Sequence, residues 1–185
     1  MLETTKFIIK ENSIPGLLEI NISLIEDARG WFMEKYQREK LVAAGFPADF
    51  TPVQQNVSFN ADIGVTRGIH AEPWNKYISV INGKVFAVFV DLRKGDNFGK
   101  KVEIQIDKKK AVFVPKGVGN SFQTLEPNTL YSYLVDAHWS AEKLGEYKSI
   151  NLADPQLAIN WPIPLDKAIV SEKDKKNPYL RQGRT

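Results

Sequence analysis

Short apolar runs separated by turn residues dominate the chain, and several of them alternate between apolar and polar side chains. The segment 101–107, KVEIQID, alternates most regularly and places Val102, Ile104 and Ile106 on one face. Successive side chains of a β-strand point to opposite faces, so this period of two is typical of a half-buried strand. The pattern therefore predicts a chain built mainly of β-strands.

The pair Asn82-Gly83 separates two of these runs, YISVI and KVFAVFVDL. Asparagine followed by glycine tolerates the positive φ angles of a type I′ turn, so the pair predicts a β-hairpin that joins the two runs. The second run is apolar on both faces, which indicates a strand covered on both sides in a sandwich or closed barrel.

One helix is expected at about residues 37–44, where Gly45 and Pro47 would end it. Beyond Ser149 the chain contains Asp-Pro, Trp-Pro and Ile-Pro turns among charged residues, which predicts an irregular tail packed over a barrel. Many short strands with evenly spaced turns favour an all-β jelly roll or sandwich. At 185 residues, we expect a single domain spanning 1–185.

Charge and composition exclude several classes of protein. The net charge is +3 and charges of both signs are interspersed, unlike the basic stripe of a nucleic-acid-binding protein. The run Lys108–Lys110 lies between two strand-like segments and fits a solvated turn better than a phosphate-binding patch. No apolar run approaches the ~20 residues of a membrane span, and the first residues lack the features of a signal peptide. We therefore expect a cytoplasmic protein that binds neither nucleic acid nor membranes.

Cysteine is absent and only two histidines occur, His70 and His138. Disulfides, thiolate metal sites and a cysteine nucleophile are therefore excluded. Neither histidine lies in an H-x-H pair or has another histidine at the spacing of metal ligands, which argues against a metal site. Arg67 and Lys76 flank His70, and two cations near a group that titrates close to neutrality suit an anionic substrate. The alternative is a structural histidine within a strand.

Two further segments allow more than one interpretation. In 130–135, LYSYLV, alternation puts Tyr131 and Tyr133 on one face, where Tyr133 is either a core residue or a proton donor. The segment 29–34, RGWFME, is either a packing element or a site where an aromatic ring stacks on a nucleotide base.

Taken together, these motifs resemble the dTDP-4-dehydrorhamnose 3,5-epimerase family. They occur in the order of that family over roughly residues 26–174, and the matching segments are DARGWFME, QQNVSF, VTRGIHAEPWNKYISV, GKVFAVFVDLRKGDNFG, VFVPKGVGNSFQTL, YSYLVDAHW, LADPQLAINWP and SEKD. The resemblance implies a cupin-like jelly-roll barrel with a few short helices and an irregular C-terminal tail. It also implies inversion at C3 and C5 of dTDP-4-dehydro-6-deoxy-D-glucose, giving dTDP-4-dehydro-L-rhamnose without cofactor or metal.

The same resemblance assigns roles to individual residues. His70 would be the general base and Asp174 would orient it. Tyr133 would be the acid on the opposite face of the sugar, and Lys76 would stabilise the enolate oxygen. The residues implied in binding the diphosphate are Arg67, Gln54 and Asn56, and those implied at the thymine are Arg29, Phe32 and Glu34. The thymine residues would come from a neighbouring subunit of a homodimer with exchanged N-terminal strands.

Two positions depart from the common family pattern: Asn120 replaces a histidine and Trp139 replaces a tyrosine. Asparagine still donates hydrogen bonds but does not titrate, and tryptophan still offers an aromatic wall for the nucleotide or sugar. We therefore expect both residues to bind substrate. The competing hypotheses are an epimerase acting at one carbon only, a non-catalytic ligand-binding cupin and a metal-dependent oxygenase.

Overall fold

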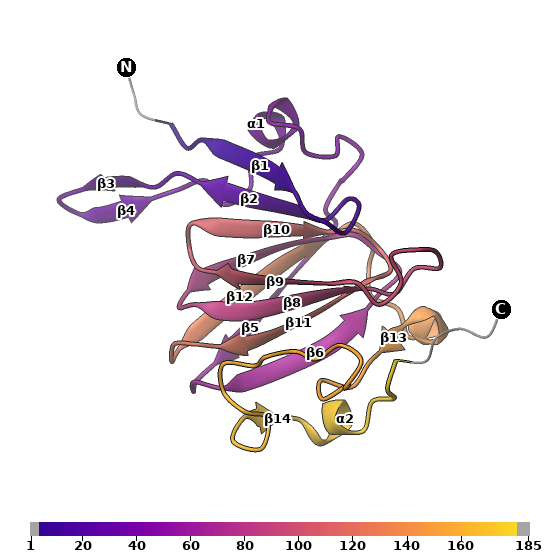
Figure 1. The fold of residues 1–185 in the computed structure, drawn as a ribbon. Coiled ribbons are helices and arrows are strands. Elements are labelled where there is room, and N and C mark those ends of the chain that lie inside the picture. Colours follow the sequence, from indigo (N-terminus) through magenta and orange to yellow (C-terminus); the bar gives the residue numbers. More distant parts are fainter. Residues whose placement is uncertain (1–3, 181–185) are drawn as a thin grey trace.

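The computed structural model describes residues 4–180, which form two packed β-sheets (Figure 1). The first sheet is antiparallel, with the order β1 (Phe7–Glu11), β2 (Leu18–Ile22), β10 (Lys110–Val114), β7 (Lys76–Asn82), β12 (Thr129–Val135) and β5 (Gln54–Asn60). The second has the order β13 (Lys148–Ser149), β6 (Val65–Ala71), β11 (Val118–Thr124), β8 (Val85–Asp91) and β9 (Lys101–Ile106). A short strand, β14 (Ile169–Val170), adds to β6 in parallel.

The remaining elements are short. A two-stranded hairpin, β3 (Ile25–Asp27) and β4 (Gly30–Phe32), projects away from the two sheets (Figure 1). The helices are α1 (Arg38–Ala43), the 3₁₀-helix η1 (Ala141–Glu146) and α2 (Glu172–Lys175). The expected helix is therefore confirmed to within one residue at each end, with Gln37 accepting a hydrogen bond as its N-cap and Gly45 following at a positive φ of 101°.

Three apolar clusters hold these layers together. The central cluster lies between the sheets and includes Ile78 of β7 and Phe89 of β8. A second cluster covers the outer face of the first sheet with α1 and its flanking segments, and includes Phe46 and Tyr77. The third covers the outer face of the second sheet with the C-terminal tail. The prediction that KVFAVFVDL is covered on both faces is confirmed, because β8 contributes to the first and third clusters.

The predicted hairpin at Asn82-Gly83 is wrong. β7 pairs with β10 and β12 in the first sheet, whereas β8 pairs with β9 and β11 in the second, so the turn connects the two sheets. Gly83 has a φ of 83°, but Asn82 is not in the positive-φ region, which a type I′ turn requires at both positions. A side chain at position 83 would also collide with Thr129, whose Oγ1 would lie 2.3 Å from a Cβ atom there.

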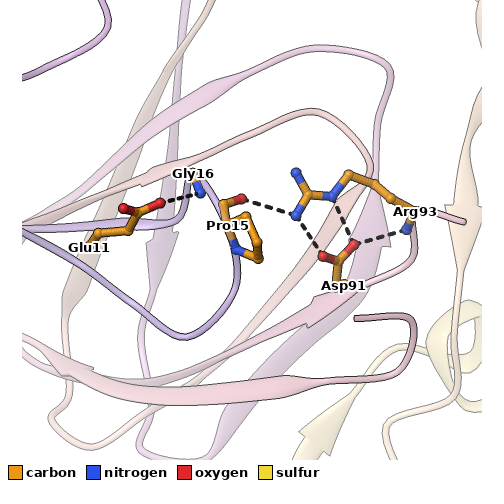
Figure 2. A network of polar contacts seen from close by, with 5 residues as sticks. All are labelled: Glu11, Pro15, Gly16, Asp91 and Arg93. Carbon is orange, nitrogen blue, oxygen red and sulfur yellow. Dashed lines mark hydrogen bonds and ion pairs between the residues drawn. The ribbon is translucent and has the colours of Figure 1, made fainter. Parts of the chain in front are cut away.

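A polar network joins the β1–β2 turn to the end of β8 (Figure 2). Arg93 binds the Asp91 carboxylate through Nε at 2.9 Å and a terminal nitrogen at 2.6 Å, and the same terminal nitrogen donates to the Pro15 carbonyl at 3.0 Å. Within the turn, Glu11 accepts a hydrogen bond from the Gly16 amide. Because Asp91 is only 1% exposed, this two-fold contact gives a charged partner to a buried carboxylate that otherwise accepts only from the Arg93 backbone amide, at 3.0 Å.

Candidate active site

A cavity of about 440 Å³ lies in the barrel and receives side chains from both sheets and from the tail. Its described lining residues are Ser58, Val65, Thr66, Arg67, Gly68, His70, Glu72, Lys76, Asn120, Phe122, Tyr131, Tyr133, Ile169, Val170, Ser171 and Asp174. Six of the twelve residues that the sequence singled out therefore share one cavity.

His70 and Asp174 form a hydrogen-bonded pair on the wall contributed by β6 and α2. His70 Nε2 lies 2.7 Å from Asp174 Oδ1, and the Gly68 amide donates to Asp174 Oδ2 at 3.4 Å. Ser171 caps the short helix by accepting from the Asp174 amide, which fixes the aspartate at that helix's first turn. Because Nε2 faces the carboxylate, Nδ1 is the ring nitrogen left to accept a proton.

The carboxylate of this pair remains ionised in its site. Burial would raise the pKa of Asp174, but the hydrogen bond and charge of His70, with smaller contributions from the Gly68 amide and Ser171, lower that pKa overall. A carboxylate that stays ionised holds the imidazole in one tautomer and one orientation.

Gly68 allows β6 to approach β11 closely beside this pair. Its φ is 122°, and a Cβ atom there would lie 2.4 Å from the Cβ of Ser121. Any other residue would push the two strands apart. His70 and Asn120 are directly opposite each other in the register of these strands, so the glycine determines how the two side chains enter the cavity.

Tyr133 reaches the cavity from β12, in the opposite sheet to His70. Burial, with a smaller contribution from the negative charge of Glu72, raises the pKa of Tyr133, so its phenol stays protonated near neutrality. Tyr131 lies two residues earlier on the same face, is 2% exposed and stacks on Phe122 with ring centroids 4.1 Å apart. The alternation expected of LYSYLV is therefore present.

Lys76 spans the interior between the sheets. Its Nζ donates to Asn120 Oδ1 at 2.7 Å and lies 2.5 Å from Glu72 Oε2. Nζ also lies 5.3 Å from the centre of the Tyr133 ring. Burial lowers the pKa of Lys76, and the carboxylate of Glu72 opposes that change. With its carbonyl oxygen turned toward Lys76, Asn120 has its amide NH₂ group available as a donor.

The residues implied in binding the diphosphate are divided between the cavity and its surroundings. Arg67 lines the cavity and is held by a hydrogen bond from Nε to Asn60 Oδ1 at 3.0 Å. Gln54 and Asn56 hydrogen-bond each other on β5 at 3.0 Å, on the same face as the cavity-lining Ser58. Gln54 also accepts from the backbone amide of Trp139, whose side chain is 56% exposed. Gln54, Asn56 and Trp139 therefore lie together but do not line the cavity.

The residues implied at the thymine do not reach the cavity of their own chain. Arg29 and Phe32 belong to the β3–β4 hairpin, where Arg29 pairs with Asp27 and Phe32 is 63% exposed. Glu34 pairs with Lys40 of α1. The hairpin projects from the barrel (Figure 1), so these side chains and the cavity of the same chain do not form one site.

Ten of the described lining residues were not singled out by the sequence, and two of these, Glu72 and Tyr131, have ionisable side chains. Tyr131 shares a face with Tyr133, and that alternation was a sufficient signal to include it. Glu72 lies between β6 and β7, where no periodicity predicts the direction of a side chain. Its proximity to Lys76 at four residues' spacing was the only hint.

Residues 4–180 contain neither a clustered metal site nor a membrane-spanning helix. No group of three or more histidine, cysteine, aspartate or glutamate side chains in this range is arranged to hold a metal ion. In the same part of the chain, no helix is long and apolar enough to cross a membrane.

Comparison with known proteins identifies close relatives. The family model described as dTDP-4-dehydrorhamnose 3,5-epimerase matches residues 11–182. "Protein RmlC homolog" of Streptococcus pyogenes serotype M6 is 49% identical over 176 residues, which cover 93% of this chain and 87% of that protein. The dTDP-4-dehydrorhamnose 3,5-epimerase of Sinorhizobium fredii is 37% identical, over 83% of this chain and 80% of that protein.

A solved structure shows the same fold. RmlC from Streptococcus suis, in complex with dTDP-D-xylose, superposes with a TM-score of 0.89 at 44% identity. The match covers 97% of this chain and 94% of that one. The two-sheet architecture is therefore the cupin-like jelly roll that the sequence motifs implied.

Proposed function

This chain belongs to the dTDP-4-dehydrorhamnose 3,5-epimerase family, and we propose that it converts dTDP-4-dehydro-6-deoxy-D-glucose to dTDP-4-dehydro-L-rhamnose. The observation that carries this proposal is the placement of two proton-transfer groups on opposite sheets of one cavity. His70, oriented by Asp174, lines it from β6, and Tyr133 lines it from β12. A base and an acid on opposite sides of a sugar ring are what stereochemical inversion at carbon requires.

The chemistry needs no redox step. The C4 ketone acidifies the hydrogens on C3 and C5, because removal of either gives an enolate whose negative charge is shared with the same oxygen. His70 Nδ1 takes the proton from one face of the ring, and the Tyr133 hydroxyl returns a proton to the other face. Lys76 and the amide of Asn120 stabilise the charge on the ketone oxygen as it develops. His70 then releases its proton and the Tyr133 phenolate takes one up, both by exchange with solvent, and repetition at the second carbon completes the double inversion.

Substrate binding uses cations and amides around the cavity. Arg67 is a guanidinium that lines it and has donors left for a phosphate oxygen after its bond to Asn60. The amides of Gln54 and Asn56 continue along β5 from the cavity toward Trp139. We assign the diphosphate to this strip and an aromatic contact with the nucleotide to Trp139.

A second copy of the chain would complete the nucleotide site. The exposed apolar side chains Val53, Val57 and Phe59 follow the outer face of β5, and Trp31 and Phe32 are exposed on the projecting hairpin. Exposed apolar stripes of this kind mark protein interfaces. We assign both exposed surfaces to the interface of a homodimer with exchanged N-terminal strands. In this dimer, Arg29, Phe32 and Glu34 meet the thymine in the partner's cavity.

Incubation of the purified protein with dTDP-4-dehydro-6-deoxy-D-glucose in D₂O tests the proposal. NMR should show deuterium at both C3 and C5, together with the L-sugar product. Deuterium at only one carbon would make the protein a single-position epimerase. Absence of both exchange and product, with the nucleotide still bound, would indicate a ligand-binding protein and would contradict the proposed activity.

A further inference from the structure

Glu72 forms an ion pair with Lys76 inside the cavity, and the proposed epimerisation gives a role to Lys76 but none to Glu72. The two side chains are 12% and 7% exposed, and Lys76 Nζ lies 2.5 Å from Glu72 Oε2. Both line the cavity. A buried ion pair seldom adds to stability when compared with apolar side chains of similar size, so stability alone is a weak reason for a charged pair at this position.

The charges around Lys76 leave Glu72 as its counterion. β6 contributes Arg67 and His70 to the cavity, and β12 contributes Tyr131 and Tyr133. Tyr147, which follows η1, lies close enough to Glu72 for the carboxylate to raise the pKa of its phenol after the larger effect of burial. Among the described lining residues only Glu72 and Asp174 are acidic, and Asp174 is engaged by His70 and the Gly68 amide.

The geometry also fixes the direction of the ammonium group. An ammonium has three N–H donors, and Lys76 donates one of them to Asn120 Oδ1, while the Glu72 carboxylate lies 2.5 Å from Nζ as the opposite charge. A further N–H is available to a ligand. A neutral amine in its place would stabilise a developing enolate far less, because it carries no charge. Burial favours that neutral form, and the neighbouring carboxylate favours the charged one.

We propose that Glu72 is a positioning residue that holds Lys76 as an ammonium ion, with one N–H directed at the ketone oxygen of the substrate. This inference rests on the proposed function and extends it to a residue outside the proton-transfer pair. It implies that Glu72 sets the upper limit of the pH range in which Lys76 can serve the reaction.

The variant Glu72→Gln tests this inference, since it keeps the size of the side chain and removes its charge. Deuterium exchange into the substrate is the rate to follow, because exchange needs proton abstraction and enolate stabilisation but not the proton supplied by Tyr133. At about pH 9 the variant should lose roughly 10²-fold in kcat for exchange, the scale of losing an oxyanion donor. At about pH 6.5 the loss should be at least tenfold smaller, with KM nearly unchanged at both values.

Two matched variants isolate the contribution of Lys76. Lys76→Arg carries a guanidinium that does not lose its proton, so adding Glu72→Gln to it should leave the alkaline limb of its pH profile where it is. Glu72→Asp keeps the charge and should keep the alkaline limb of the wild type, even where activity is reduced by the shorter side chain. It also serves if Glu72→Gln does not fold.

A direct titration makes the result independent of turnover. In protein labelled with ¹³C and ¹⁵N at lysine, the Lys76 signal is the one lost in Lys76→Arg, and its titration midpoint should be lower in Glu72→Gln than in the wild type. An unchanged midpoint, or a loss of exchange equal at every pH, would overturn the role given to Glu72. If the wild type neither exchanges nor converts the substrate, the proposed function fails, and the titration still decides whether Glu72 keeps Lys76 charged.

Discussion

Substitutions of His70 on β6 and Asp174 on α2 test their proposed roles as the base and as the group that orients it. His70→Ala should reduce deuterium exchange at both C3 and C5 by at least roughly 10²–10⁴-fold, because one imidazole serves both carbons. Circular dichroism should show a folded protein, since the His70 side chain is 35% exposed. Near-normal exchange in His70→Ala would mean that another group is the base.

Asp174→Asn should have a smaller effect than His70→Ala. The amide leaves the imidazole in place but removes the charge that fixes its tautomer and orientation. Steady-state rates of the two variants, measured side by side with the wild type, give the comparison. Equal or greater loss in Asp174→Asn would contradict this order of effects.

The residues of the site differ in how far the sequence could predict them. His70, Lys76 and Tyr133 were predicted because their motifs carry a family resemblance and the structure brings them into one cavity. Glu72 was not predicted, because a side chain between two strands has no periodicity that fixes its direction. The role proposed for Arg29 and Phe32 depends on a second chain, and the position of a second chain does not follow from a pattern within one sequence.

At the scale of elements, Arg93 fastens the β1–β2 turn of the first sheet to the end of β8 in the second sheet by its hydrogen bond to the Pro15 carbonyl (Figure 2). Arg93→Ala should destabilise the fold by about 2–3 kcal/mol, because it removes the guanidinium and leaves the buried Asp91 carboxylate with only the backbone amide of residue 93 as a donor. Urea denaturation measures this free energy of unfolding. The matched control is Lys84→Ala, which breaks an exposed ion pair 3.7 Å long and should cost at most about 0.5 kcal/mol. Equal losses in the two variants would contradict the importance given to the network.

The segment between β4 and α1 contains a partly buried lysine that should make stability depend on pH. Burial lowers the pKa of Lys35 to about 8, and its Nζ donates to the Lys108 carbonyl at 2.5 Å. Between this value and the ordinary pKa of lysine, the unfolded chain binds the proton more tightly than the folded one, so stability rises with pH. The gain from pH 7 to pH 9 should be roughly 1 kcal/mol.

Lys35→Met isolates that contribution. The variant should lack this rise, so the difference in unfolding free energy between it and the wild type should change by that amount over the same range. Guanidinium denaturation at both pH values measures the difference. A difference that is constant with pH would show that Lys35 does not titrate in this range.

The turn at Asn82-Gly83 shows why strand connections are harder to predict than strands. The apolar runs YISVI and KVFAVFVDL located β7 and β8 correctly, and the double apolar face of the second run predicted its coverage. The turn residues indicated a local hairpin. Pairing instead follows from the long-range contacts of each strand, since β7 lies between β10 and β12 and β8 between β9 and β11. β9 follows β8 directly, but β10, β11 and β12 lie further along the chain, so the turn at 82–83 does not select any of these partners.

At the scale of the whole molecule, the hairpin β3–β4 should act in the cavity of a partner subunit. Light scattering should give the mass of a homodimer, and complementation tests the exchange. The His70→Ala variant should have an inactive cavity and an intact hairpin. The double variant Arg29→Ala/Phe32→Ala should have an intact cavity and a defective hairpin. Co-expressed at equal amounts, they should recover about a quarter of wild-type activity, because half of the dimers are mixed and each has one complete site. No recovery in purified mixed dimers would place the hairpin at its own cavity, and a fully active monomer would exclude the exchange.

The central claim is that inversion requires groups on both sheets, with His70 on one wall and Tyr133 on the other. Tyr133→Phe tests it most directly, because the change removes only the hydroxyl and keeps the ring. In D₂O, the variant should still exchange deuterium into the substrate through His70, mainly with retained configuration, while formation of the L-sugar falls far more than exchange. Inversion at the wild-type rate in Tyr133→Phe, or equal loss of exchange and inversion, would contradict the claim.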